Sequence, residues 1–330
     1  MGDREGTFIA VDTGIRRMGP RPAGSMDGSA FIEHLKNTCK MQSYFHPTLQ
    51  RWITIWDSQK IVEEFHKQVK AGNVPDFAKP ENFKQVSSTQ TRGDKTYTVT
   101  FAISPYYLAV GSNTDYIIMP MNGFMGKTIA AELGLELPTR KMIVDILPRP
   151  PNNSVQGRFN SVIEVGRAML GREPPWMNSQ GGYNEEGANK FMDPEIIQEH
   201  SRMAHRSLGL TNNAPLGNRI YGGTRKDLLY DQKLENKPNE AIYQFERGVG
   251  TTHNMYHVDY SQGIRYVWPT VTIRIHDNKT NTDELKVMRY SDVIKHPDYF
   301  FLLSEVKMDV NTMYHLPRQA NRGQPTAISR

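Results

Sequence analysis

The stretch TYTVTFAI, residues 96–103, decides the fold class because apolar and polar residues alternate along it. The alternation places four large apolar residues on one face of an extended strand: Tyr97, Val99, Phe101 and Ile103. This pattern predicts a half-buried strand of an antiparallel sheet. Residues 106–110 and 115–119, separated by the turn residues GSNT, predict a hairpin next to it.

Helical periodicity follows and precedes these strands. After Asp57 or Ser58, either of which can cap a helix, apolar residues recur at helical spacing until Gly72. The sequence DPE at 193–195 supplies a cap, a proline in the first turn and an acidic residue, and predicts a helix that ends near residue 208. We expect further helices at 29–37 (capped by Ser29), 123–133, 139–147, 290–295 and 297–303, and further strands at 240–245, 255–260, 264–276 and 285–288.

Helices and antiparallel strands without βαβ alternation predict an α+β fold with a single main body. We assign this body to residues 29–315, between an extended N-terminal arm (1–28) and a C-terminal tail (316–330). Both terminal segments are rich in glycine, proline and arginine, and such segments become ordered when they pack on the body or on a neighbouring subunit. They therefore predict a homo-oligomer or particle subunits held through the arms. The proline-rich stretch 148–192 predicts a long irregular insertion that serves as a lid, a linker or a subunit contact.

Composition narrows the classes of partner. Lys and Arg number 40 against 35 Asp and Glu, and these charges are interspersed, which is typical of a solvated surface rather than a nucleic-acid-binding one. Cys39 is the only cysteine, so an internal disulfide and a cysteine-based zinc site are excluded. Neither a secretory leader nor an apolar run of membrane-spanning length is present. We therefore expect synthesis in the cytoplasm without a signal peptide, association with a particle where the arms mediate it, and no membrane partner.

The segment YHVDYSQGIR, residues 256–265, concentrates reactive side chains. On an extended strand His257 and Asp259 share a face, with side-chain origins about 6–7 Å apart. An imidazole and a carboxylate at this distance can converge on one substrate atom, and Tyr260 and Ser261 add hydroxyl groups. Acid–base catalysis is one interpretation of the pair. The other is a hydrogen-bonded histidine and aspartate of the core.

A divalent metal is a second use of the same residues. It would need a third ligand, for which His200, on the inner face of the helix expected after residue 193, joins His257 and Asp259. His253 and His257 have the spacing of a helical zinc pair, but along a strand they lie about 13 Å apart and are not expected to share a metal. The sequence leaves the cofactor open.

Two segments suggest anion binding. Residues 222–227, GGTRKD, end in Lys226 and Asp227, which can hold an anionic group or orient a base, or can simply stabilise a turn as a surface ion pair. The sequence GKT at 126–128 matches the end of a phosphate-binding loop, but Met121 occupies the position of the required glycine. We therefore expect GKT to lie at the start of a helix.

Several segments resemble, in the same order, those of a family of uncharacterised bacterial proteins. Residues 104–112, SPYYLAVGS, resemble its PDYLAIGSD block, and residues 137–142, LPTRKM, resemble its LPTRKMVD. The residues KDLL at 226–229 and HVDYSQGIR at 257–265 are similar to its KDVV and VDYSHGIR. The resemblance implies functional roles for Arg140, Lys141, Asp145, His200, Lys226, Asp227, Asp259, Tyr260 and Ser261.

Gln262 stands where that family has a histidine. Glutamine keeps a hydrogen bond but does not take a proton near neutral pH. The sequence leaves open whether this departure abolishes activity.

These observations predict a hydrolase-like protein acting on a polar polymer or a peptide-like bond, with the cell wall as one source of substrate. In this hypothesis Asp259 orients a group or accepts a proton, and Lys226 or Arg140 holds an anionic group. His257 or His200 is then the acid–base group or ligand. The alternative is a structural component of a phage-like or contractile-injection particle on the same fold. An enzyme requires the site residues to meet, whereas a particle subunit requires the arms to leave the body.

Overall fold

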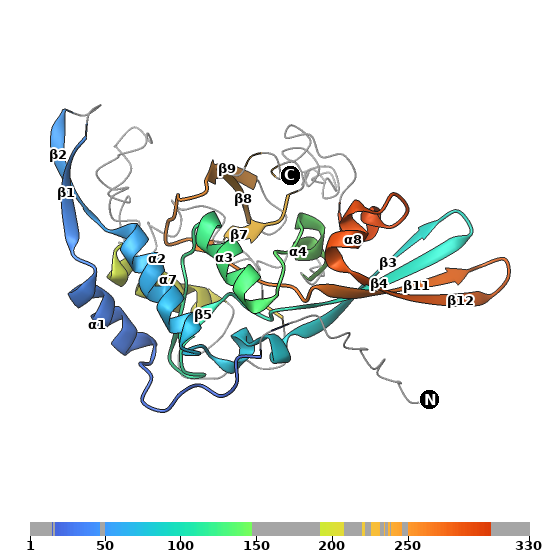
Figure 1. Ribbon diagram of the computed structural model, residues 1–330, viewed down its shortest axis with the longest axis horizontal. Coiled ribbons are helices and arrows are strands. Elements are labelled where there is room, and N and C mark those ends of the chain that lie inside the picture. Colours follow the sequence, from blue (N-terminus) through green and yellow to red (C-terminus); the bar gives the residue numbers. More distant parts are fainter. Residues whose placement is uncertain are drawn as a thin grey trace, which may run out of the picture.

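The computed structural model describes residues 15, 17–46, 50–146, 192–207, 220–221, 226–231, 234, 237, 239–245 and 250–304. The expected tail 316–330, nearly all of the expected insertion 148–192 and the turn residues 222–225 lie outside the described residues. Helices and mainly antiparallel strands confirm the α+β prediction (Figure 1).

The sheet that contains the TYTVTFAI stretch is fully antiparallel. Its strand order is β12 (Thr282–Arg289), β11 (Thr270–Asp277), β4 (Lys95–Ile103) and β3 (Lys84–Arg92). Val99 and Phe101 of β4 are fully buried, whereas on the other face the hydroxyl groups of Thr98 and Thr89 lie 3.0 Å apart across the strands. The predicted one-sided burial of this strand is therefore confirmed. The two hairpins project together to the right in Figure 1.

A second four-stranded sheet carries the candidate site. Its order is β10 (Gln262–Gly263), β7 (Lys226–Leu229), β8 (Glu240–Phe245) and β9 (Gly250–Asn254). The short strand β10 pairs with β7 in parallel, and the other pairs are antiparallel. Two separate hairpins complete the strands: β1 (Met41–His46) with β2 (Arg51–Trp56), and the predicted pair β5 (Ala109–Gly111) with β6 (Tyr116–Ile118).

The helices begin close to where the sequence places them. They are α1 (Gly28–Thr38), α2 (Ser58–Lys70), α3 (Gly123–Leu133), α4 (Arg140–Ile146), α7 (Pro194–Ser207) and α8 (Tyr290–Lys295). Asp57 caps α2 as expected, but Asp27 rather than Ser29 caps α1, because its carboxylate accepts a hydrogen bond from the amide of Ala30 at 2.9 Å. The second helix expected at the end of the body is a single 3₁₀ turn, η4 (Phe300–Leu302). None of the described helices has the length and apolar character that a membrane span requires.

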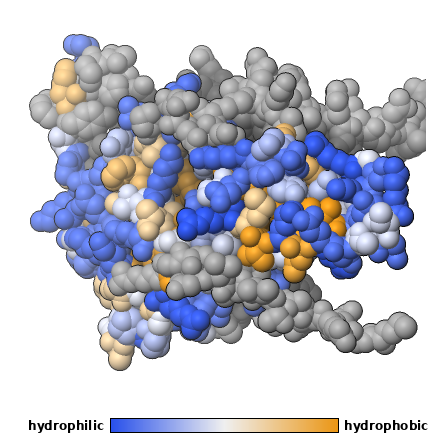
Figure 2. Space-filling view, turned by 45° about the vertical axis from the view of Figure 1, so that its right-hand side comes forward, coloured by the Kyte–Doolittle hydropathy of each residue, from blue (hydrophilic) through white to orange (hydrophobic). Residues whose placement is uncertain are grey.

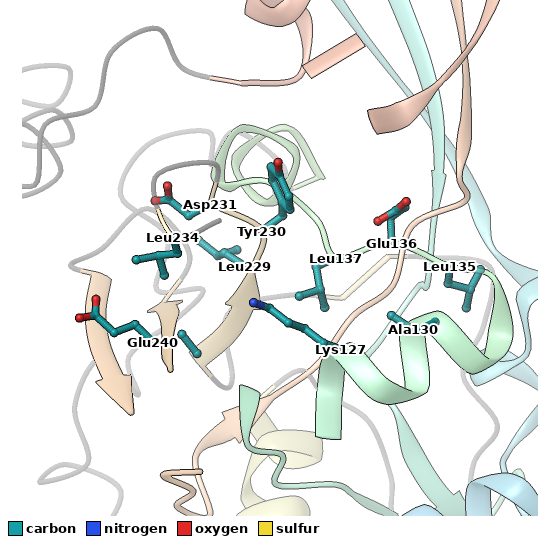
Figure 3. A pocket seen from close by; sticks show the side chains of 12 residues that line it. Lys127, Ala130, Leu135, Glu136, Leu137, Leu229, Tyr230, Asp231, Leu234 and Glu240 are labelled. Carbon is teal, nitrogen blue, oxygen red and sulfur yellow. The ribbon is translucent and has the colours of Figure 1, made fainter. Parts of the chain in front are cut away.

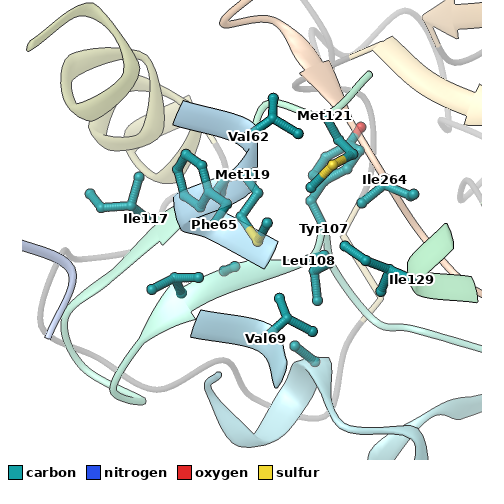
Figure 4. Close-up of a cluster of buried hydrophobic side chains, with 14 of the residues drawn as sticks. Val62, Phe65, Val69, Tyr107, Leu108, Ile117, Met119, Met121, Ile129 and Ile264 are labelled. Atoms are coloured by element: carbon teal, nitrogen blue, oxygen red, sulfur yellow. The ribbon is translucent and has the colours of Figure 1, made fainter. Parts of the chain in front are cut away.

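Two hydrophobic clusters form the core of the described chain. In the first, side chains of α2 and α3 meet those of residues 107–121, and Figure 4 shows Phe65 of α2 beside Met119. The second lies between the β4–β11 face and the helices α4 and α8. On the face shown in Figure 2 hydrophilic residues predominate, and hydrophobic ones gather in a few separate areas.

Helix α3 lies unusually close to the second sheet. A Cβ atom on Gly123 would come within 2.5 Å of the Cβ atom of Ala241, and one on Gly126 within 2.5 Å of a methyl group of Leu228. Both positions therefore need the bare glycine backbone. Helix α3 begins after Asn122, which caps it, and the GKT sequence falls in its second turn. The expected position of this motif, at the start of the helix, is therefore wrong by one turn.

The described part of the expected N-terminal arm packs on its own chain. The side chain of Arg21 donates a hydrogen bond to Oδ1 of Asn73 at 2.6 Å, and the amide of the Asn73 side chain donates one to the carbonyl of Met26 at 2.8 Å. Met18 and Met26 contact the first hydrophobic cluster. Residues 17–28 thus do not show the departure from the body that the particle hypothesis requires.

Candidate functional site

The residues around His257 form a turn, so the strand expected at 255–260 is wrong. Strand β9 ends at Asn254, whose side-chain oxygen accepts a hydrogen bond from the amide of Tyr256 at 2.9 Å and whose carbonyl accepts one from the amide of His257 at 3.0 Å. This asparagine turn reverses the chain. As a result the rings of His253 and His257 stack with centroids 4.3 Å apart, instead of lying about 13 Å apart along a strand.

Asp259 is the centre of a buried hydrogen-bonded network. One carboxylate oxygen lies 2.5 Å from Nζ of Lys226. The other accepts hydrogen bonds from the backbone amide of Ser261 at 2.8 Å and from its hydroxyl at 2.5 Å. The amide of Asp259 donates to Oε1 of Gln262 at 3.1 Å. The parallel pairing of Gln262 with Lys226 across β10 and β7 brings these groups together.

Charge pairing keeps Asp259 ionised. Burial alone would raise the pKa of its carboxyl group, but Lys226, His257 and Ser261 together hold that pKa well below its usual range. A carboxylate of this kind is not a proton acceptor at neutral pH. Asp259 therefore acts as a fixed negative charge for its neighbours.

His257 links this buried network to the solvent. Its Nε2 atom lies 3.7 Å from a carboxylate oxygen of Asp259, and its side chain is 35% exposed. Burial, together with the charges of His257 and Lys226, lowers the pKa of the stacked His253 to about 4. His253 is thus neutral at pH 7 and packs against the ring of His257.

Asp227 belongs to a different network, although it follows Lys226 directly. Neighbouring residues of a strand point to opposite faces, so Lys226 and Asp227 do not pair. The Nε atom of Arg265 lies 3.0 Å from the Asp227 carboxylate, and the hydroxyl of Tyr107 donates to its other oxygen at 3.2 Å. Burial raises the pKa of Asp227 to about 6, and Arg265 offsets part of this rise. The guanidinium of Arg265 also lies over the Tyr107 ring, at 4.2 Å, and donates to the carbonyl of Tyr221.

The site residues expected on α4 are engaged elsewhere. Lys141 pairs with Asp145 at 2.5 Å and donates to the hydroxyl of Ser88 on β3 at 3.1 Å. Arg140, at the first position of the same helix, is buried, and α4 packs on β3. Among the described residues, the contacts of Asp259 come from its own turn and from β7, not from α4.

The expected metal ligands do not assemble. His200 is buried and its ring meets the ring of Tyr260 edge-on, with centroids 5.0 Å apart. Tyr260 is itself fully buried in the first hydrophobic cluster. Within the described part of the chain, no three histidine, cysteine or acidic side chains are grouped so as to hold a metal ion. The expected metal-binding set of His200, His257 and Asp259 is therefore wrong. Of these three residues, His257 and Asp259 form the ion pair described above.

Two exposed aromatic residues beside His257 were not predicted from the sequence. Tyr256 and Phe124 are 52% and 46% exposed, and their rings stack with centroids 5.4 Å apart. The amide of Phe124 donates to the carbonyl of Met255, which ties the start of α3 to the turn. The position of Tyr256 next to His257 was the only signal in the sequence.

Comparison of the chain with protein-family models, with curated proteins and with solved structures finds no match. The geometry of the site is therefore the basis for assigning a function.

Proposed function

We propose that this protein is a hydrolase acting on a polar polymer or a peptide-like bond, and that His257 transfers the protons. The observation that carries the proposal is a partly exposed imidazole 3.7 Å from a buried carboxylate, Asp259, which Lys226 and Ser261 hold in its charged form. Imidazole takes and returns protons near neutral pH, and is the side chain most often used for this purpose.

The network supports a division of roles. With Nε2 facing Asp259, the Nδ1 nitrogen of His257 is the one left for a water molecule or a substrate hydroxyl. A carboxylate behind an imidazole selects the tautomer and stabilises the imidazolium that forms when the ring takes a proton. Lys226 and Ser261 act through Asp259 as positioning residues. The exposed rings of Phe124 and Tyr256 offer an apolar contact for substrate on the same surface.

The glutamine at 262 is compatible with this scheme. Its Oε1 atom accepts the hydrogen bond that closes the turn around Asp259, and this function needs no titrating group. Proton transfer is assigned to His257, which lies at the surface, whereas Gln262 is fully buried.

The proposal is tested by measuring hydrolysis of purified bacterial cell-wall polymer, of neutral polysaccharides and of a casein-type protein substrate. His257→Gln keeps the size and hydrogen bonding of the side chain but cannot transfer a proton, so we expect a loss of turnover of about 10²–10⁴-fold. His276→Gln is the matched control, because His276 is also 35% exposed and also lies beside a carboxylate, Asp283, at 3.1 Å. We expect this control to retain full activity.

Two results would contradict the proposal. One is the absence of hydrolysis by the wild-type protein on all three substrate classes. The other is a His257→Gln variant that hydrolyses its substrate as fast as the His276→Gln control.

A further inference from the structure

A cavity of about 320 Å³ lies beside α3, and its lining includes residues of the first hydrophobic cluster. Its walls come from the middle of α3, from residues 135–137, from the end of β7 and from the start of β8 (Figure 3). This volume falls in the range of about 300–1,000 Å³ that is usual for small-molecule sites. The cavity is therefore large enough to hold a small ligand.

The lining combines an apolar floor with charges of both signs. Leu137, Leu229 and Ala130 supply aliphatic surface, and the ring of Tyr230 lies at the margin. In Figure 3 Lys127 reaches from α3 toward Leu229, while Glu136 lies on the other side of Leu137. Two further carboxylates, those of Asp231 and Glu240, complete the rim.

Neither the side chain of Lys127 nor that of Glu136 forms a close polar contact with the other or with another described residue. Among the described residues, neither side chain has a hydrogen bond or an ion pair within 4 Å, whereas Glu240 pairs with Lys237 at 3.6 Å. Burial raises the pKa of Glu136, and the more distant charge of Lys295 offsets this only in part. The half-buried carboxylate of Glu136 gains free energy when a ligand supplies it with a hydrogen bond, and the exposed ammonium group of Lys127 offers a charged hydrogen-bond donor at the rim.

The mixed signs define the class of ligand. A hydroxyl group donates to a carboxylate and accepts from an ammonium group, so one polyhydroxylated molecule satisfies Lys127 and Glu136 together. The C–H face of a sugar ring matches the aliphatic floor, and an ion of either sign would meet a like charge. We propose that the cavity binds a neutral saccharide unit of a polysaccharide. This inference rests on the proposed function, for which it names the substrate class.

The cavity lies beside β8 of the second sheet, and His257 lies in the turn that follows the neighbouring strand β9. Ala241 lines the cavity and is the direct cross-strand partner of His253, whose ring stacks on His257. Phe124, which stacks on Tyr256, precedes Lys127 by one turn of α3. A polysaccharide chain with one unit in the cavity therefore has a short path over these two aromatic rings to the imidazole.

The test is equilibrium binding to the full chain, by calorimetry and by NMR of the protein, with cellobiose and N,N′-diacetylchitobiose as probes. Hexylamine and hexanoate serve as charged probes of similar length. We expect at least one disaccharide to bind, and Lys127→Met and Glu136→Gln each to weaken that binding by about tenfold or more, because each removes a charge-assisted hydrogen bond. Lys279→Met and Glu81→Gln, at exposed positions elsewhere, are the matched controls and should bind as the wild type does.

A third variant separates binding from folding. Ala131 lines the cavity but is exposed on α3, so Ala131→Leu narrows the cavity without adding a side chain to the core. We expect this variant to lose disaccharide binding and to keep the unfolding midpoint of the wild type. The inference is overturned if no disaccharide binds, if the charged probes bind and the sugars do not, or if all three variants bind as the controls do.

Failure of this inference is distinguishable from failure of the proposed function. His257→Gln should bind the disaccharide with the affinity of the wild type, because the imidazole lies outside the cavity. Disaccharide binding without hydrolysis of any polymer would overturn the hydrolase and leave the saccharide site in place. Hydrolysis without binding in the cavity would overturn the saccharide site alone.

Discussion

Strand β7 presents two consecutive charged residues to two different environments. On one face Asp227 and Arg265 form a pair that is sealed completely, with Arg265 0% exposed and stacked on Tyr107. On the other face Lys226 and Asp259 form a shorter pair, at 2.5 Å against 3.0 Å, and His257 continues this pair to the surface. The comparison shows that burial and close charge pairing do not themselves indicate a reactive site. What distinguishes the two networks is a partly exposed imidazole, that of His257, at the boundary with solvent.

The sealed network should give the largest effect on stability. Arg265→Met removes the only cation that contacts Asp227 among the described residues and leaves a buried carboxyl group without its counter-ion. We expect the free energy of unfolding to fall by about 3–5 kcal/mol, measured by urea denaturation. Arg274→Met is the control, because the Arg274–Asp283 pair is exposed, and its unfolding midpoint should not change. An equal midpoint for both variants would contradict the assignment of a structural role to Arg265.

The network that reaches the surface should respond less in stability and more in activity. Asp259→Asn keeps an oxygen for Ser261 but removes the charge opposite Lys226, so we expect a loss of about 2–3 kcal/mol at pH 7 together with loss of turnover. The folded-state pKa of Asp259 is lowered, so its contribution to stability is complete above the ordinary aspartate pKa of about 3.9 and is lost as the pH falls further. Urea denaturation at pH 7 and at pH 3 measures both effects. A difference between variant and wild type that is as large at pH 3 as at pH 7 would contradict this account.

His253 should make the same network sensitive to mild acid. Its pKa is lowered to about 4 in the folded protein, so between the ordinary histidine value of about 6.5 and pH 4 the unfolded chain takes up a proton that the folded chain does not. Stability is therefore lost as the pH falls through this window, by about 1–2 kcal/mol after allowance for the partial exposure of the ring. This loss should be absent from the stability curve of His253→Phe, so the difference between the variant and wild-type curves should change across the window. A constant difference across the window would refute the prediction.

Ser261 should give the smallest effect. Ser261→Ala removes the hydroxyl bond to Asp259 but keeps the bond from the backbone amide, so we expect a loss of about 1 kcal/mol. Ser25→Ala, at an exposed hydroxyl, is the control in the same urea titration and should leave the midpoint unchanged. A loss in the control as large as that in Ser261→Ala would show that the Asp259 network adds nothing at this position.

The fold was predictable where the local pattern and the tertiary contacts agree. The alternation through residues 96–103 and the cap at Asp193 identify a strand and a helix that the structure confirms. Strand β3 was missed because its residues are nearly all polar, and only its pairing with β4 makes it a strand.

The sequence identified the segment that holds the candidate site, but it did not predict how the side chains of that segment are arranged. The histidine and aspartate at 257 and 259 do meet, yet through a turn started by Asn254 rather than along a strand. The contact of Lys226 with Asp259 depends on a two-residue parallel pairing between distant segments, which no local pattern signals. The cavity that Lys127 and Glu136 line is likewise formed only where α3 packs beside β7 and β8.

The two bare glycines of α3 have a consequence for how this protein can vary. A single methyl group at Gly123 or Gly126 would act as a spacer that pushes the helix away from Ala241 or Leu228. Lys127 and Phe124 lie on that same helix. The proposed ligand contact of Lys127 and the aromatic contact of Phe124 near His257 would therefore shift together. In the proposed hydrolase, substrate preference and turnover would thereby depend on one helix-to-sheet distance.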